Sequence, residues 1–68
     1  MNFTIELEQE NDGRWIAEVL ELRGTLVYGR TREEVTAKGQ ALALRVLADR
    51  LEHGEADADL VHVTFNAA

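Results

Sequence analysis

One long segment with helical periodicity, residues 32–53, constrains the fold of this chain more than any other feature. A capping-box pattern precedes it, because the Thr31 hydroxyl can accept a hydrogen bond from the Glu34 amide while the Glu34 side chain reaches back. Gly54 is placed to end the helix, since glycine readily adopts the left-handed conformation found at helix C-termini. A single amphipathic helix of this length needs a sheet on which to bury one of its sides.

Segments that alternate between apolar and polar residues flank this helix, which is typical of half-buried strands. Phe3, Ile5 and Leu7 alternate with polar residues and predict the first strand. Asp12-Gly13 then indicates a tight hairpin, because glycine accepts a positive φ without steric cost. Three further strands are expected at residues 15–20, 25–28 and 60–65.

The element order β-β-β-α-β predicts an α+β fold in which residues 1–68 form a single domain. We expect one four-stranded mixed sheet with one helix packed on one face. A right-handed crossover through the helix brings the fourth strand parallel to the first, which predicts the strand order 3-2-1-4.

The helix has two apolar sides. Val35, Gly39, Leu42 and Val46 form one side, which we expect to face the sheet. The other side carries small residues and leucines, with Leu47 at its edge.

A chain of 68 residues without cysteine has little core and no disulfide, so a partner subunit is the remaining way to stabilise it. We therefore predict a homodimer or higher homo-oligomer through the second side, against the alternative of an alanine-rich helix with a few exposed leucines. The predicted interface consists of Ala37, Ala41, Leu44, Ala48 and Leu51.

Acidic residues outnumber basic ones by 13 to 7, which gives a formal net charge of −6 at pH 7. Tight binding to a phosphate backbone needs clustered lysines and arginines, so we expect no nucleic-acid binding by this chain alone. An acidic surface instead favours a basic protein partner. We predict that one end of the molecule forms an acidic docking patch, against the alternative of a solvated acidic loop. The patch consists of Glu21, Glu52, Glu55, Asp57 and Asp59.

The residues from Gly13 to Val19, Gly-Arg-Trp-Ile-Ala-Glu-Val, resemble the second strand of the HicB-like antitoxins. The spacing to Gly24, then Gly29-x-Thr31-x-Glu33-Glu34 and a long helix, is also similar to that family's N-terminal domain. The resemblance covers almost the whole chain. It implies a partially degraded RNase H-like fold that binds and blocks HicA, a small basic ribonuclease toxin.

The chain departs from the family pattern in two places. Residues 20–25 replace a segment that often reads Pro-x-x-Pro-Gly-Cys and contain neither proline nor cysteine. The sequence also ends three residues after Phe65, so we expect no C-terminal DNA-binding segment and carry over no operator binding.

Residues able to support catalysis are sparse. An RNase H site needs clustered carboxylates that hold two metal ions. Glu6 and Glu8 share a polar strand face and Glu18 lies on the next strand; we interpret this face as solvated. We expect no catalytic residue, no metal and no cofactor.

The sequence contains neither a signal peptide pattern nor an apolar run long enough to cross a membrane, which indicates a cytoplasmic protein with no membrane partner. Together these features predict a non-enzymatic protein-interaction domain that resembles HicB antitoxins, with a HicA-like toxin as the candidate partner. The alternatives are a nucleic-acid-binding module and a stand-alone oligomeric domain of unknown role.

Overall fold

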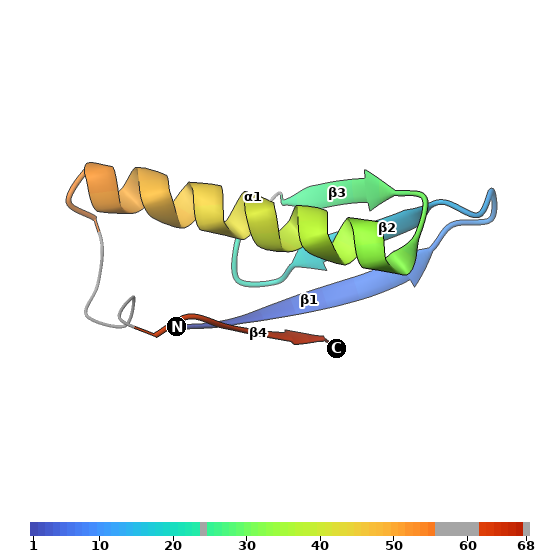
Figure 1. The fold of residues 1–68 in the computed structure, drawn as a ribbon, viewed down its shortest axis with the longest axis horizontal. Helices are drawn as coiled ribbons and strands as arrows, with labels where there is room; N and C mark the ends of the chain where they lie inside the picture. The colour runs from blue at the N-terminus through green and yellow to red at the C-terminus, as the bar shows by residue number, and fades with distance from the viewer. Residues whose placement is uncertain (24, 56–61, 68) are drawn as a thin grey trace.

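The computed structural model describes residues 1–23, 25–55 and 62–67, and it confirms the predicted α+β architecture. One helix lies across one face of a four-stranded sheet whose strand order is β3-β2-β1-β4 (Figure 1). The element bounds differ from the predicted ones by a single residue at the second strand, the third strand and the helix. The elements are β1 (Asn2–Gln9), β2 (Trp15–Val19), β3 (Leu26–Gly29), α1 (Arg32–Glu52) and β4 (Thr64–Ala67).

Strand pairing follows the predicted topology. β1 pairs antiparallel with β2, and β2 pairs antiparallel with β3. β4 runs parallel to β1, as the right-handed crossover requires. The β1–β2 hairpin closes where the Gly13 amide donates to the Glu10 carbonyl at 3.0 Å, and Gly13 has a φ of +92°. This positive φ is the reason that glycine occupies the turn.

Capping residues bond to free backbone groups at both ends of α1. The Thr31 hydroxyl accepts a hydrogen bond from the Glu34 amide at 3.0 Å, as the capping-box pattern predicts. The Glu34 carboxylate accepts from the Arg30 amide at 3.4 Å and pairs with Lys38 at 3.1 Å. His53 caps the C-terminus, and Gly54 follows with a φ of +68°. The helix is therefore bounded where the sequence indicates.

The buried line along α1 differs from the predicted one. The buried helix residues are Val35, Gly39, Ala43 and Leu47, whereas the predicted Leu42 and Val46 are only half-buried. A four-residue step advances by about 40° beyond a full turn, so this line winds around the helix. A helix that packs obliquely across strands buries such a line. The core consists of Phe3, Ile5, Ala17, Val19, Leu22, Val35, Ala43 and Leu47.

The fourth strand lies closer to the C-terminus than predicted. β4 covers Thr64–Ala67 instead of residues 60–65, and residues 60 and 61 lie outside the described part of the chain. The parallel ladder starts where the Thr64 amide donates to the Met1 carbonyl at 3.0 Å. It then places Phe65 beside Phe3, with ring centroids 5.6 Å apart. This pairing with β1, which the alternation alone does not encode, determines where the strand begins.

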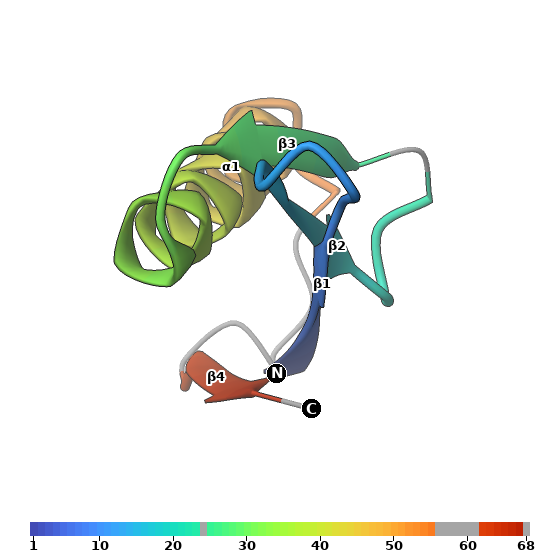
Figure 2. The ribbon, with the colours of Figure 1, turned by 90° about the vertical axis from the view of Figure 1, so that its right-hand side faces the viewer.

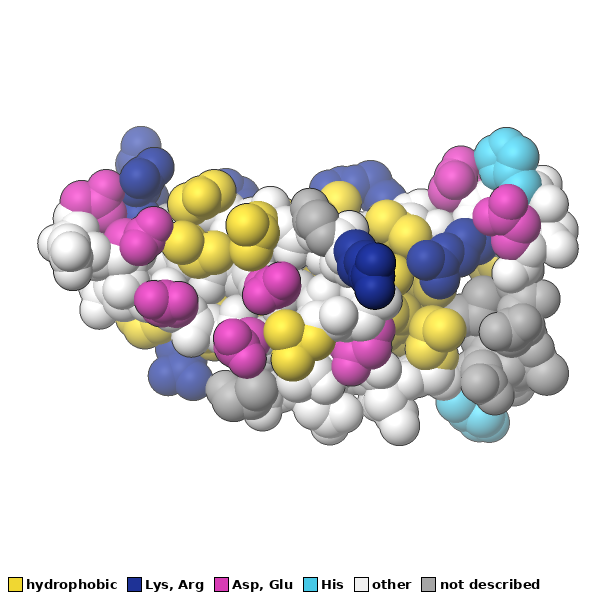
Figure 3. Space-filling view, turned by 180° about the vertical axis from the view of Figure 1, so that it is seen from behind, with side chains coloured by type: hydrophobic (Ala, Val, Ile, Leu, Met, Phe, Trp, Pro, Cys, Tyr) yellow, Lys and Arg dark blue, Asp and Glu magenta, His cyan; other side chains and the backbone are white. Residues whose placement is uncertain are grey.

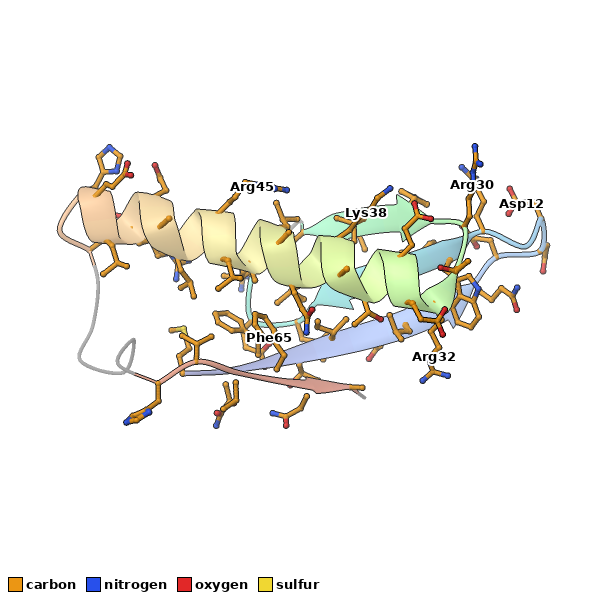
Figure 4. All side chains as sticks on the ribbon, viewed as in Figure 1. Asp12, Arg30, Arg32, Lys38, Arg45 and Phe65 are labelled. Carbon is orange, nitrogen blue, oxygen red and sulfur yellow. The ribbon has the colours of Figure 1, made fainter. Side chains whose placement is uncertain are left out.

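The helix covers the sheet unevenly. Figure 2 shows that the sheet curves, so that α1 lies close to β2 and β3 while β4 lies away from β3. The molecule is elongated, with extents of 41 × 19 × 17 Å. Lys38 reaches from α1 to the edge strand and donates to the Tyr28 carbonyl oxygen at 3.0 Å (Figure 4).

Candidate interaction surfaces

The predicted oligomer interface lies on the side of α1 that faces away from the sheet. Leu44 and Leu51 are 50% and 57% exposed, Ala37 and Ala48 are exposed, and Ala41 is half-buried. These positions are separated alternately by four and three residues, which is the spacing of a coiled-coil seam. Ala41 and Ala48 occupy one seam position, and Ala37, Leu44 and Leu51 occupy the other; the small residues allow two helices to approach closely. The structure therefore presents most of this seam to solvent.

The described part of the predicted acidic patch is divided between two elements. Glu52 and Glu55 are exposed at the end of α1, which extends beyond β2 and β3 (Figure 1). Glu21 instead follows β2 and is attached to the sheet. Asp57 and Asp59 lie outside the described residues.

Glu21 closes the end of the β1–β2 ladder with its side chain. Its carboxylate accepts from the Thr4 amide at 2.7 Å and from the Thr4 hydroxyl at 2.9 Å. These bonds stabilise the charged form and lower the pKa of Glu21 below its usual range, with the Thr4 amide as the largest cause. The chain turns away from β1 after Leu20. The Glu21 carboxylate therefore accepts from the Thr4 amide in place of a backbone carbonyl of β2. Its first role is therefore structural.

The helix-free face of the sheet carries Glu6, Glu8 and Glu18, which the sequence pattern favours as a solvated polar face, together with several apolar side chains. We define this surface by the residues of β2 and β3 that point away from α1, together with Glu6 and Glu8 of β1 and with Leu20. Apolar side chains and carboxylates are interspersed on it (Figure 3), because Glu18 lies on β2 between Ile16 and Leu20, while Glu6 and Glu8 lie on β1. Its members are Glu6, Glu8, Ile16, Glu18, Leu20, Leu26 and Tyr28.

Three of these apolar side chains are about half exposed: Leu20 at 46%, Leu26 at 52% and Tyr28 at 46%. One signal for them was present in the sequence. Ile16 and Leu20 occupy the positions of the second strand where an alternating pattern would place polar residues.

Two carboxylates oppose each other on this face. Glu6 on β1 lies directly opposite Glu18 on β2, whereas Glu8 lies opposite Ile16. Like charges in directly opposite positions destabilise an antiparallel pair. The sheet therefore contains a local charge repulsion that its own fold does not require.

An arginine already contacts the apolar part of this face. The Arg14 guanidinium lies 5.3 Å from the centroid of the Tyr28 ring, a favourable cation–π distance. Asp12 holds the arginine by accepting from its Nε at 2.8 Å and from its backbone amide at 3.0 Å. The backbone hydrogen bond from Arg14 is the main reason that the pKa of Asp12 is lowered.

A small hollow lies on the other face, where α1 leaves β1 and β4 partly uncovered. Its volume is about 130 Å³, well below that of most cofactor or substrate pockets. Phe65 extends from β4 toward α1 and forms one wall (Figure 4). The other lining residues are Ile5, Leu7, Thr36, Gln40, Asn66 and Ala67.

Within residues 1–23, 25–55 and 62–67, no group of three or more histidine, aspartate or glutamate side chains is placed to hold a metal ion. The same residues include no helix that is both long and apolar enough to cross a membrane. Comparisons of the chain with family models, curated proteins and solved structures find no match.

Proposed function

We propose that this chain is a non-enzymatic protein-interaction domain that acts as HicB-like antitoxins do, by binding a small basic protein. A HicA-like ribonuclease toxin is the candidate partner. The observation that carries the proposal is the exposure of large apolar side chains on two separate outer surfaces, the helix-free sheet face and the outer side of α1. Exposed apolar patches framed by polar residues are typical of protein interaction sites.

Two further features support the proposal. The strand order and the single helix agree with the fold that the HicB resemblance implies. The net charge of −6 favours encounter with a basic partner and disfavours a nucleic-acid ligand.

The proposal includes self-association through the outer side of α1 and a location in the cytoplasm, where a ribonuclease toxin would act. The seam of Ala37, Ala41, Leu44, Ala48 and Leu51 supports the first part, because its spacing fits helix pairing. A two-fold axis across this seam would bring it against its own copy and leave the sheet face free for a different partner.

The test is isothermal titration of the purified chain with a small basic protein encoded beside it in the genome. We expect saturable binding with an affinity of about 1 μM or tighter and, for a ribonuclease partner, loss of RNA cleavage when the two proteins are mixed. The absence of a neighbouring basic protein, or one that does not bind at micromolar concentrations, would contradict the proposal.

A further inference from the structure

The helix-free sheet face has an apolar half on β2 and β3 and an acidic half that follows β1 and includes Glu18 of β2. Ile16 and Tyr28 are paired across β2 and β3, and Leu26 lies next to them on β3. An antiparallel sheet that has one solvated face normally places polar side chains there. Three strands at the usual spacing make this surface about 10 Å wide, close to the diameter of one α-helix with its side chains.

The acidic half lies along β1 and extends onto β2. Glu6 and Glu8 project from β1, and Glu18 projects from the neighbouring β2. None of the three forms an ion pair with another residue of the described ranges 1–23, 25–55 and 62–67. Glu6 and Glu18 face each other, so a cation placed between them would remove a repulsion as well as gain an attraction.

The contact of Arg14 with Tyr28 shows that the apolar half also accepts a guanidinium group at its hairpin end. We infer that this face is the docking surface for an amphipathic basic helix of the partner protein. The helix lies along the strands, with its apolar side over Ile16, Leu26 and Tyr28 and its arginines or lysines over Glu6, Glu8 and Glu18. This inference rests on the proposed function and adds to it the surface and the chemistry of the partner segment.

The other exposed surfaces fit such a helix less well. The outer side of α1 carries Leu44 and Leu51 in a seam without a central carboxylate, which suits a second copy of this chain. The end of α1 exposes the carboxylates of Glu52 and Glu55, but its neighbouring residues His53 and Gly54 offer no apolar side chain, and Leu51 belongs to the seam. Among residues 1–23, 25–55 and 62–67, the sheet face is where several apolar side chains lie beside opposed carboxylates.

The experiment is an NMR titration of the ¹⁵N-labelled chain with a synthetic helical peptide of leucine, alanine and arginine. A peptide of about 18 residues spans roughly 27 Å, similar to the length of β1. Leucines run along one side of the peptide and arginines along the adjacent side. A matched peptide has every leucine replaced by glutamine. We expect the first peptide to shift the backbone amides of β1, β2 and β3, and the second to bind about tenfold more weakly.

Two double variants separate this face from general charge attraction. Glu6→Gln with Glu18→Gln should weaken binding of the leucine–arginine peptide about tenfold or more. Glu33→Gln with Asp49→Asn makes the same charge change at exposed helix positions and should leave binding within about twofold. The first variant should melt at the same temperature as the parent chain or a few degrees higher, because it removes a like-charge pair. A loss of binding can then not be attributed to unfolding.

Amide shifts that concentrate on α1, or equal weakening by both double variants, would overturn the inference. A natural basic partner that binds with full affinity to the Glu6→Gln, Glu18→Gln variant would also overturn it while leaving the proposed function intact. Conversely, peptide binding at this face combined with no natural basic partner would contradict only the proposed function.

Discussion

Gly29, the last residue of β3, lies against Val35 in the first turn of α1. A Cβ atom added to Gly29 would stand 3.0 Å from the backbone nitrogen of Val35 and 3.1 Å from its Cβ. The short connection between β3 and α1 fixes this approach, because Thr31 caps the helix only two residues after the strand ends. Gly29 is therefore required by packing, and its φ is not positive.

Alanine at two glycines should have opposite effects on stability. Gly29→Ala forces a side chain against the helix backbone and should cost about 1–3 kcal/mol of unfolding free energy. Gly39→Ala places its Cβ 3.7 Å from the Ala17 Cβ, an ordinary contact, and should gain about 0.5–1 kcal/mol through helix propensity. Chemical denaturation of both variants checks this pair. A destabilised Gly39→Ala variant would show that the helix lies closer to the sheet than described.

Truncation of two leucines should distinguish the core side of α1 from its outer side. Leu47 is buried in the core, so Leu47→Ala should cost about 2–5 kcal/mol. Leu44 is 50% exposed, so Leu44→Ala should cost less than about 1 kcal/mol in dilute solution. The measurement is urea denaturation at low micromolar protein concentration. Similar costs for the two variants would contradict the assignment of the buried line.

Self-association through the outer side of α1 predicts a change in sedimentation. Leu44→Glu with Leu51→Glu places two charges in the seam and should convert the oligomer to a monomer. Sedimentation velocity at increasing concentration measures this change. If the variant keeps the parent mass, the contact must lie elsewhere, and the outer edge of β4 would be the next surface to test. A parent chain that is monomeric at high micromolar concentration would contradict self-association altogether.

The hydrogen bonds from Thr4 predict that acid weakens the fold. They lower the folded-state pKa of Glu21 below its reference value of 4.5. Glu21 therefore stabilises the fold above that pH, and the stabilisation is lost as the pH falls through the folded-state pKa. Glu21→Gln should reduce the loss of stability between about pH 5 and pH 3.

Some acid sensitivity should remain in this variant, because the pKa values of Asp12 and Glu34 are lowered as well. Thermal melts at several pH values provide the measurement. Superimposable curves of melting temperature against pH for the parent and Glu21→Gln would contradict the role assigned to the Thr4 contacts.

The elements and their topology could be predicted from local signals in the sequence. Thr31 and Gly54 bound the helix, and Asp12-Gly13 marks the hairpin, because each acts through its own backbone geometry. The helical periodicity placed the five predicted interface residues on one outer side of α1, and the structure has them there. The order of the strands in the sheet was predictable because a right-handed crossover allows few arrangements.

Features that depend on distant contacts could not be predicted. The helix residues that face the sheet depend on the crossing angle, so Ala43 and Leu47 were missed in favour of Leu42 and Val46. The start of β4 depends on its register with β1. The helix-free sheet face was not recognised as an interaction surface. Its mixture of apolar and acidic side chains becomes visible only when the residues of β1, β2 and β3 are placed side by side.

The parallel pairing of β4 with β1 has a consequence for the order of folding. The three antiparallel strands and α1 follow one another along the chain, so their contacts form by closing short loops. The β1–β4 ladder instead joins residue 2 to residue 64 and residue 5 to residue 67, which closes a much longer loop. Contacts of high sequence separation generally form late, after the local ones have restricted the chain. The stacking of Phe65 on Phe3 is therefore expected to complete the core as the last step of folding, and to separate first when the protein opens.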